Sequence, residues 1–190
     1  MKDTMIIVEG PQGAGKTTFT NYLREKIPAT DLYRLTGIKD KTKTGYPKIR
    51  KKYLKLLEYI ENCEDVNMIF DRTFFSEEVY SRLGFKSYSF HDIYEELLKK
   101  LDSLNFDIYF VVLYIKDTSE YKKRIERDKG EYQKFAVESS IRQQEEYLKL
   151  ADEIEKTTKN IKVIRYDNSN CENYKEKINE QFGFLFDSVN

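Results

Sequence analysis

Cysteine and histidine are scarce in this chain of 190 residues, which holds two cysteines and one histidine. Cys63 and Cys171 lie far apart without a CxxC spacing, and His91 completes no zinc-binding set with them. The pattern therefore argues against a disulfide framework and against a structural zinc site. It is typical of reduced structural thiols and predicts a cytoplasmic protein.

Long apolar runs and linkers are also missing. No apolar run approaches the ~18 residues of a membrane-spanning helix, and the first residues lack the shape of a signal peptide. Three prolines occur, and no stretch rich in Pro, Gly and Ser divides the chain. We therefore expect one continuous domain over residues 1–190, without a membrane partner.

Charge of one sign is not in excess, because 33 basic and 33 acidic residues cancel. Net charge thus predicts neither nucleic-acid nor membrane binding, which only a local patch would provide. Apolar residues, in contrast, make up 39% of the chain and aromatic residues 14%. This content excludes a disordered protein and is sufficient for a full core.

Short apolar runs alternate with segments of helical spacing. Strand-like runs lie at 5–8, 31–35, 67–70, 107–115 and 161–166. Helical patterns lie at 16–26, 48–61, 93–101, 137–154 and 174–182. This alternation predicts an α/β fold whose parallel sheet is covered by helices on both faces, with ligands bound at the carboxyl ends of the strands.

The sequence GPQGAGKT at 10–17 follows the first apolar run and fits the P-loop pattern G-x-x-x-x-G-K-[ST]. Backbone N–H groups of such a loop surround a β-phosphate, and the following helix directs its positive end at the phosphates. Lys16 reaches the β- and γ-phosphate oxygens, and the Thr17 hydroxyl can ligate Mg²⁺. A glycine turn with an incidental lysine is the weaker interpretation. The residues predicted to bind the nucleotide phosphates are Gly10, Gln12, Gly13, Ala14, Gly15, Lys16, Thr17 and Thr18.

A P-loop alone does not separate a switch, a motor and a kinase. The DxxG and NKxD motifs of GTPase switches do not occur in the sequence. Motor proteins are usually larger than this chain. A small phosphoryl-transfer kinase is the remaining common class, and such an enzyme needs an acceptor site and a lid.

Asp71 and Arg72 follow the third apolar run, at a strand end that faces the P-loop in a parallel sheet. A carboxylate there can bind Mg²⁺ or water, or take a proton from an acceptor hydroxyl. An arginine there can clamp an acceptor phosphate with two parallel hydrogen bonds. The alternative is an aspartate that caps a helix, followed by a surface arginine.

A basic segment further along predicts a lid at about 124–135. Arg124, Arg127 and Lys129 precede Gly130 and a new helix. Phosphoryl transfer spreads charge over the equatorial oxygens, which cations on a closing lid would stabilise. Because acidic residues interleave with these bases, a solvated helix end is the equal alternative.

Together these features resemble the thymidylate kinase branch of the P-loop nucleotide kinases, close kin of the deoxynucleoside kinases. IIVEGPQGAGKTT is similar to the opening of that branch, with Glu9 before the loop. DRTFFSEEVY matches its Asp-Arg…Ser…Tyr pattern, in which Tyr80 is the last member. DIYFVVLYI…YKKRIERD and SSIRQQEEYLKLADE followed by IKVIRYDNSN resemble the later elements, so the likeness spans roughly residues 5 to 180.

The resemblance implies a three-layer P-loop fold with a five-stranded parallel sheet and a short lid. It implies ATP and Mg²⁺ as cofactors and a deoxynucleoside monophosphate as acceptor. A dTMP-like pyrimidine is the best single guess for that acceptor. Related kinases often form dimers, so a homodimer is compatible with it. The implied catalytic residues are Lys16, Asp71, Arg72, Arg124 and Arg127, with Thr17 and Asp71 on the metal. The expected acceptor contacts are Glu9, Gln12, Arg34, Arg72 and Tyr80, the last against the deoxyribose.

Several positions depart from that family. Gln12 stands where a carboxylate often contacts the 3′-hydroxyl, and Ser81 where a base-reading glutamine often follows the tyrosine. Of the family's Arg-Glu-Pro-Gly-Gly-Thr segment, Arg34 and Gly37 remain. Base specificity is therefore open. Four aromatic residues are candidates for the ring that stacks on the base: Tyr53, Tyr59, Phe74 and Phe75. The spacing of each fits a core position better than a base contact.

The segment 39–52, KDKTKTGYPKIRKK, carries seven basic residues and one acidic residue. It is either a solvated loop and helix start, or a phosphate grip with Arg50 as the best candidate. A groove for a nucleic-acid backbone, as in a DNA-end kinase, is a third interpretation. Nucleic acid is thus the less favoured partner after a small nucleotide.

Three other functions remain beside the monophosphate kinase. A deoxynucleoside kinase would need a base near the 5′-hydroxyl, for which Asp71 or Glu9 would serve. A nucleic-acid-binding protein would use the basic segment 39–52. A catalytically inactive nucleotide-binding module would bind ATP without turnover.

Overall fold

The computed structural model describes residues 2–127 and 137–186 of the chain. Its strands form one parallel sheet in the order β2-β3-β1-β4-β5. Their bounds are β1 Asp3–Glu9, β2 Thr30–Arg34, β3 Asn67–Asp71, β4 Phe106–Tyr114 and β5 Ile161–Asp167. The five-stranded parallel sheet that the sequence and the resemblance predicted is confirmed.

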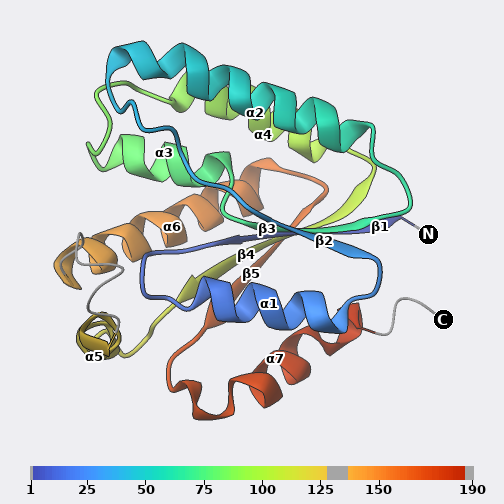
Figure 1. The fold of residues 1–190 in the computed structure, drawn as a ribbon, viewed down its shortest axis with the longest axis vertical. Coiled ribbons are helices and arrows are strands. Elements are labelled where there is room, and N and C mark those ends of the chain that lie inside the picture. The colour runs from blue at the N-terminus through green and yellow to red at the C-terminus, as the bar shows by residue number, and fades with distance from the viewer. Residues whose placement is uncertain (1, 128–136, 187–190) are drawn as a thin grey trace.

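Helices cover both faces of the sheet and make the three layers seen in Figure 1. α2, α3, α4 and α6 lie on one face, and α1 and α7 lie on the other. α5 stands at the carboxyl ends of the strands. The helices are α1 Lys16–Lys26, α2 Tyr46–Glu61, α3 Phe74–Arg82, α4 His91–Asp102, α5 Glu120–Arg127, α6 Val137–Thr157 and α7 Tyr174–Phe182.

The central strand β1 separates two apolar cores. Met5 and Ile7 pack under α2, α3, α4 and α6, whereas Ile6 and Val8 pack under α1 and α7. Successive side chains of a strand point to opposite faces, so a strand covered on both sides is apolar throughout. The uninterrupted apolar run that opens the sequence therefore forms the middle of the sheet.

The register of the sheet places the functional ends of three strands together. Val8 of β1 is level with Asp71 of β3, and Arg34 of β2 is level with the same aspartate. In parallel strands these carboxyl ends share one edge, from which the P-loop also leaves β1. Asp71 and Arg34 thus lie beside the loop at 10–17.

Several boundaries differ from the predicted ones by up to three residues, and α3 and α5 lie outside the predicted helical patterns. α2 begins at Tyr46 instead of 48, because Pro47 lies in its first turn, where the missing N–H is not needed. α5 ends at Arg127, and the remainder of the predicted lid, up to residue 135, lies outside the described residues. Within the described parts of the chain, no helix is long and apolar enough to cross a membrane.

Candidate active site

The loop between β1 and α1 has the backbone that its glycines predict. Gly10, Gly13 and Gly15 have φ of 149°, 83° and 88°. A Cβ on Gly10 would lie 2.5 Å from the carbonyl oxygen of Leu113, so β4 packs directly against the start of the loop. A Cβ on Gly15 would lie 2.5 Å from Nδ2 of Asn168. Gly10 is required by close approach to backbone as well as by conformation, whereas at Gly15 the near atom is the end of a side chain and the positive φ is the firmer requirement.

Replacement of Gly10 by alanine is expected to lower the free energy of unfolding by roughly 2–5 kcal/mol, since a backbone clash adds to the conformational strain. Gly84 is a matched control, because it has φ of 77° but no atom within 4 Å of an added Cβ. Gly84→Ala is expected to cost about 1–2 kcal/mol. Urea unfolding of both variants measures the difference, and equal losses would contradict the close approach at Gly10.

Lys16 turns its ammonium into the loop, where Nζ donates to the carbonyl oxygen of Pro11 at 2.7 Å. The side chain is buried, and burial lowers the pKa of Lys16 well below its ordinary value. Arg72 lowers this pKa further, while Asp71 and Glu9 oppose the shift. An anionic phosphate in the loop would supply the charge that this buried ammonium lacks.

Asp71 and Thr17 bring two oxygen atoms together beside the loop. Thr17 Oγ1 lies 3.4 Å from Asp71 Oδ2, and Arg34 Nε lies 3.7 Å from the same oxygen. Neighbouring ligands of an octahedral Mg²⁺, each at about 2.1 Å, are about 3 Å apart. The pair therefore fits two ligands of such an ion. Among the described residues no group of three or more His, Cys, Asp or Glu could hold a metal, so phosphates and water would complete the shell.

Arg72 occupies a strained position directly after β3. Its φ is 71°, and its backbone N–H donates to the carbonyl oxygen of Val8 at 3.1 Å. Nη1 donates to the hydroxyl groups of Tyr80 at 2.8 Å, Ser76 at 3.3 Å and Tyr147 at 3.3 Å. Left-handed backbone at a residue other than glycine costs about 1 kcal/mol or more and is concentrated at functional sites. The contacts orient the guanidinium toward this edge of the sheet.

Glu9 lies at the end of β1 and is fully buried. Oε1 accepts hydrogen bonds from the backbone N–H of Thr73 at 2.6 Å and from its hydroxyl at 3.2 Å. Oε2 accepts one from the Ser76 hydroxyl at 2.6 Å. Burial raises the pKa of Glu9 to about 7, although Ser76 and Arg72 act in the opposite direction. Both carboxylate oxygens are thus engaged by α3 and the residue before it.

The shifted pKa predicts that Glu9 makes the fold less stable as pH rises. The unfolded chain gives up this proton near pH 4.5 and the folded chain near pH 7, so the stability fully present below pH 4.5 is lost as pH approaches 7. The shift corresponds to about 3 kcal/mol. Urea unfolding at pH 5 and pH 8 is expected to show a smaller loss for Glu9→Gln than for the wild type. Identical pH dependence in the two proteins would reject the assignment.

Arg124 holds α5 against the P-loop. Nη1 donates to the carbonyl oxygen of Gly13 at 3.1 Å, and Nη2 donates to the carbonyl oxygen of Asn168 at 2.6 Å. Nδ2 of Asn168 in turn donates to the carbonyl oxygen of Ala14 at 2.7 Å. The loop after β5 and the predicted lid helix therefore meet on the P-loop. Arg127 is the last residue of α5.

Solved structures resemble this chain in fold. A thymidylate kinase from Candida albicans has a TM-score of 0.61 at 14% identity, covering 96% of this chain and 92% of that chain. A deoxyadenosine kinase from M. mycoides with dCMP and dCDP has a TM-score of 0.66 at 18% identity, covering 96% and 98%. A structure of the M. mycoides kinase with dATP has a TM-score of 0.57 at 19% identity, covering 85% and 90%. This chain has the fold of these P-loop kinases. No family model and no curated protein matches the sequence.

In this P-loop kinase fold most of the predicted residues come together, but Arg50 does not. Its guanidinium lies 3.5 Å from Glu96 of α4, and its side chain is about half exposed. Gln12 contacts α6, since its backbone N–H donates to Oε1 of Gln143 at 3.4 Å. Thr18 is exposed on the first turn of α1. The predicted acceptor grip by Arg50 is thus not supported by its contacts.

Of the four rings considered for base stacking, Tyr53, Phe74 and Phe75 belong to the core, as expected from their spacing. Tyr59 does not: it is 50% exposed, and its hydroxyl lies 3.0 Å from that of Tyr33. No pattern in the sequence indicated Tyr147 as an arginine partner or Asn168 as a P-loop contact. Each lies on a distant element of the kinase fold that only the sheet and helix packing brings to the site.

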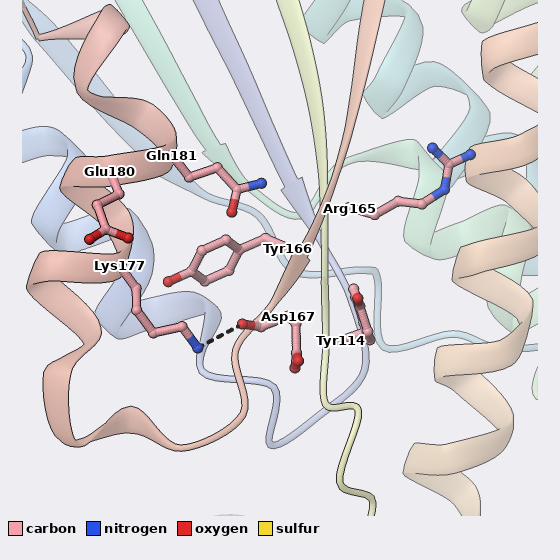
Figure 2. Close-up of a pocket in the computed structure, with 7 residues that line it drawn as sticks. All are labelled: Tyr114, Arg165, Tyr166, Asp167, Lys177, Glu180 and Gln181. Atoms are coloured by element: carbon pink, nitrogen blue, oxygen red, sulfur yellow. Dashed lines mark hydrogen bonds between the residues drawn. The ribbon is translucent and has the colours of Figure 1, made fainter.

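A cavity of about 490 Å³ lies outside the site, between the end of β5 and α7 (Figure 2). Arg165 and Tyr166 leave β5 on opposite sides, and Lys177 of α7 donates to the carbonyl oxygen of Asp167. The charge of Arg165 is matched by Asp152 and Glu155 of α6. None of the predicted site residues lines this cavity. Its lining residues are Tyr114, Arg165, Tyr166, Asp167, Lys177, Glu180 and Gln181.

Proposed function

We propose that this protein transfers the γ-phosphoryl group of ATP to a deoxynucleoside monophosphate and releases the diphosphate and ADP. A dTMP-like pyrimidine is the best single acceptor. The observation that carries the proposal is the position of Asp71 and Arg72, at the strand end beside the P-loop, with Asp71 Oδ2 3.4 Å from Thr17 Oγ1. The fold likeness to a thymidylate kinase and a deoxyadenosine kinase supports it.

The donor side is served by the loop and Lys16. Backbone N–H groups and the positive end of α1 bind the β- and γ-phosphates. Lys16 exchanges its contact with the Pro11 carbonyl oxygen for a phosphate oxygen. Thr17 and Asp71 would hold Mg²⁺, which neutralises charge on the phosphate oxygens when bound.

The acceptor side is served by arginines. Nη1 of Arg72 is held by three hydroxyl groups, while its Nε and Nη2 donate no hydrogen bond within the described parts of the chain. These two atoms form a fork that suits two oxygens of one phosphate. Arg34, beside Asp71, adds a second cation. Together they position an acceptor phosphate for attack on the γ-phosphorus.

A monophosphate acceptor also suits a site in which Glu9 is engaged by hydrogen bonds and Asp71 is assigned to the metal. Its attacking oxygen is already anionic, so no residue has to remove a proton. A nucleoside 5′-hydroxyl needs a base. Glu9 is occupied by Thr73 and Ser76, which leaves Asp71 for that role. Deoxynucleoside kinase activity through Asp71 is the second candidate, favoured by the likeness to a deoxyadenosine kinase.

Product identification tests the proposal. Purified protein, ATP and Mg²⁺ are incubated with deoxynucleosides, deoxynucleoside monophosphates and 5′-hydroxyl DNA, and the products are weighed by mass spectrometry. A diphosphate formed from one monophosphate is the expected result and names the base. Monophosphates formed from nucleosides would establish the second candidate. Phosphorylated DNA would overturn both and direct attention to the basic segment 39–52.

A further inference from the structure

Two side chains outside the predicted set meet beside the P-loop. Tyr121 of α5 and Gln144 of α6 are both buried, and the Tyr121 hydroxyl donates to Oε1 of Gln144 at 2.5 Å. A Cβ built on Gly13 would lie 3.4 Å from Cδ1 of the Tyr121 ring, so the ring faces Gly13 with about the space of one methyl group between them. The ring therefore lies beside the middle of the loop.

Gln144 is itself fixed by the end of β4. Oε1 accepts from the backbone N–H of Ile115 at 2.8 Å, and Nε2 donates to the carbonyl oxygen of Ile115 at 3.1 Å. The amide thus satisfies both polar groups of a buried backbone unit, as a neighbouring strand would. Because three hydrogen bonds hold this side chain, the Tyr121 hydroxyl has a partner of fixed position.

The same stretch of loop is held from other directions. Arg124, three residues after Tyr121 and therefore on the same face of α5, donates to the carbonyl oxygen of Gly13. The backbone N–H of Gln12 donates to Gln143. Gly13 has no side chain, and its φ of 83° lies in the left-handed region that favours glycine. The contacts from α5 and α6 therefore hold this part of the loop.

We propose that Tyr121 and Gln144 are positioning residues, which set the P-loop at Gly13 in the geometry that receives the donor triphosphate. The inference rests on the proposed function, because it takes the loop as the donor site. Neither side chain has to touch the nucleotide. A displacement of about 1 Å in a binding group can cost up to ~10²-fold. The loss belongs to the donor side, since Arg72 and Arg34 hold the acceptor independently.

Binding of a non-hydrolysable ATP analogue with Mg²⁺, measured by calorimetry, tests this without turnover. Tyr121→Leu removes the ring and is expected to weaken binding about tenfold. Tyr121→Phe keeps the ring and loses one hydrogen bond, so a loss of about threefold is expected. Tyr94 of α4 is a matched control, being a buried tyrosine that packs on Phe74 and Phe75. Tyr94→Leu is expected to lower the Tm while binding stays within about twofold of wild type.

A double-mutant cycle joins the two residues. Gln144→Met removes the hydrogen-bond partner, so Tyr121→Phe is expected to have no further effect on analogue binding in that background. In steady-state assays these variants are expected to raise the KM for ATP and to leave the KM for the acceptor unchanged. A rise in the KM for ATP alone distinguishes a positioning role from general destabilisation. If Tyr121→Leu does not fold, Tyr121→Phe and Gln144→Met still test the proposal.

Unchanged analogue binding in Tyr121→Phe and Gln144→Met, or an equal rise of both KM values, would overturn the inference while the proposed function stands. Equal weakening by Tyr94→Leu would overturn it in the same way. A wild-type protein that binds no analogue would instead overturn the proposed function and this inference with it. The two failures are therefore distinguishable from the wild-type titration alone.

Discussion

Replacement of Lys16 by methionine is expected to abolish phosphoryl transfer and leave the fold intact. The ammonium is buried in the loop, where it donates to the Pro11 carbonyl oxygen at 2.7 Å, and burial lowers its pKa. Methionine matches the length of the side chain without burying a charge, so the stability is expected to stay equal or rise slightly. Loss of a cation aimed at developing phosphate charge is expected to reduce turnover by about 10³-fold.

The measurement is steady-state diphosphate formation, with the Tm of each protein from calorimetry. Lys162→Met is a matched control, because Lys162 lies on the far edge of the sheet with its side chain about half exposed. Its activity is expected to equal that of the wild type. Normal turnover in Lys16→Met would reject the assignment of the loop, whereas a large fall in its Tm would show that Lys16 supports the fold.

Arg72→Ala is expected to damage acceptor use far more than donor binding. In the proposed function the guanidinium donates from Nε and Nη2 to an acceptor phosphate, and a charged bidentate contact is worth roughly 3–4 kcal/mol when its partner would otherwise stay buried and unpaired. The value of kcat/KM for the acceptor is therefore expected to fall by about 10²–10³-fold. The dissociation constant of ATP is expected to change by less than about threefold.

Two further variants separate charge from structure at this position. Arg72→Lys keeps the charge and loses the fork, so it is expected to recover part of the acceptor affinity. Arg165→Ala, remote from the site and paired with Asp152 and Glu155, is the control for removal of an arginine. Equal losses of donor and acceptor affinity in Arg72→Ala would place the residue outside the acceptor site. The free energy of unfolding of each variant is measured as well, because residue 72 has a strained φ of 71°. Alanine tolerates this backbone conformation no better than arginine does.

The kinase fold was predictable because its signals are local. The apolar run from Met5 to Val8 has the composition of a strand buried on both faces, and the glycine loop after it has a fixed spacing. Once strands and helices alternate, the strand ends gather at one edge. Asp71 and Arg72 could therefore be placed beside the P-loop from the sequence, and the 3.4 Å contact of Thr17 with Asp71 agrees with that placement.

The residues that hold the site residues in place were determined by tertiary packing. Tyr147 reaches Arg72 across 75 positions of sequence, and Asn168 reaches Ala14 across 154. Helical periodicity indicates which face of a helix is buried, but it does not say which side chain meets which partner. For Arg50 the basic segment left a phosphate grip open beside a solvated surface, and only the packing of α2 on α4 shows that its guanidinium lies 3.5 Å from Glu96.

The sequence by itself determined the five strands, the helices α1, α2, α4, α6 and α7, their order, and the chemistry of the loop and of the Asp-Arg pair, since each depends on residues close together in the chain. The tertiary structure alone decided that Glu9 is enclosed by α3 and that Gln144 holds the Tyr121 hydroxyl, with the ring facing Gly13. Those contacts depend on the relative positions of whole helices and strands, which are set by the fit of side chains in the core. The geometry that holds the phosphate loop is therefore a property of the folded chain and not of the motif.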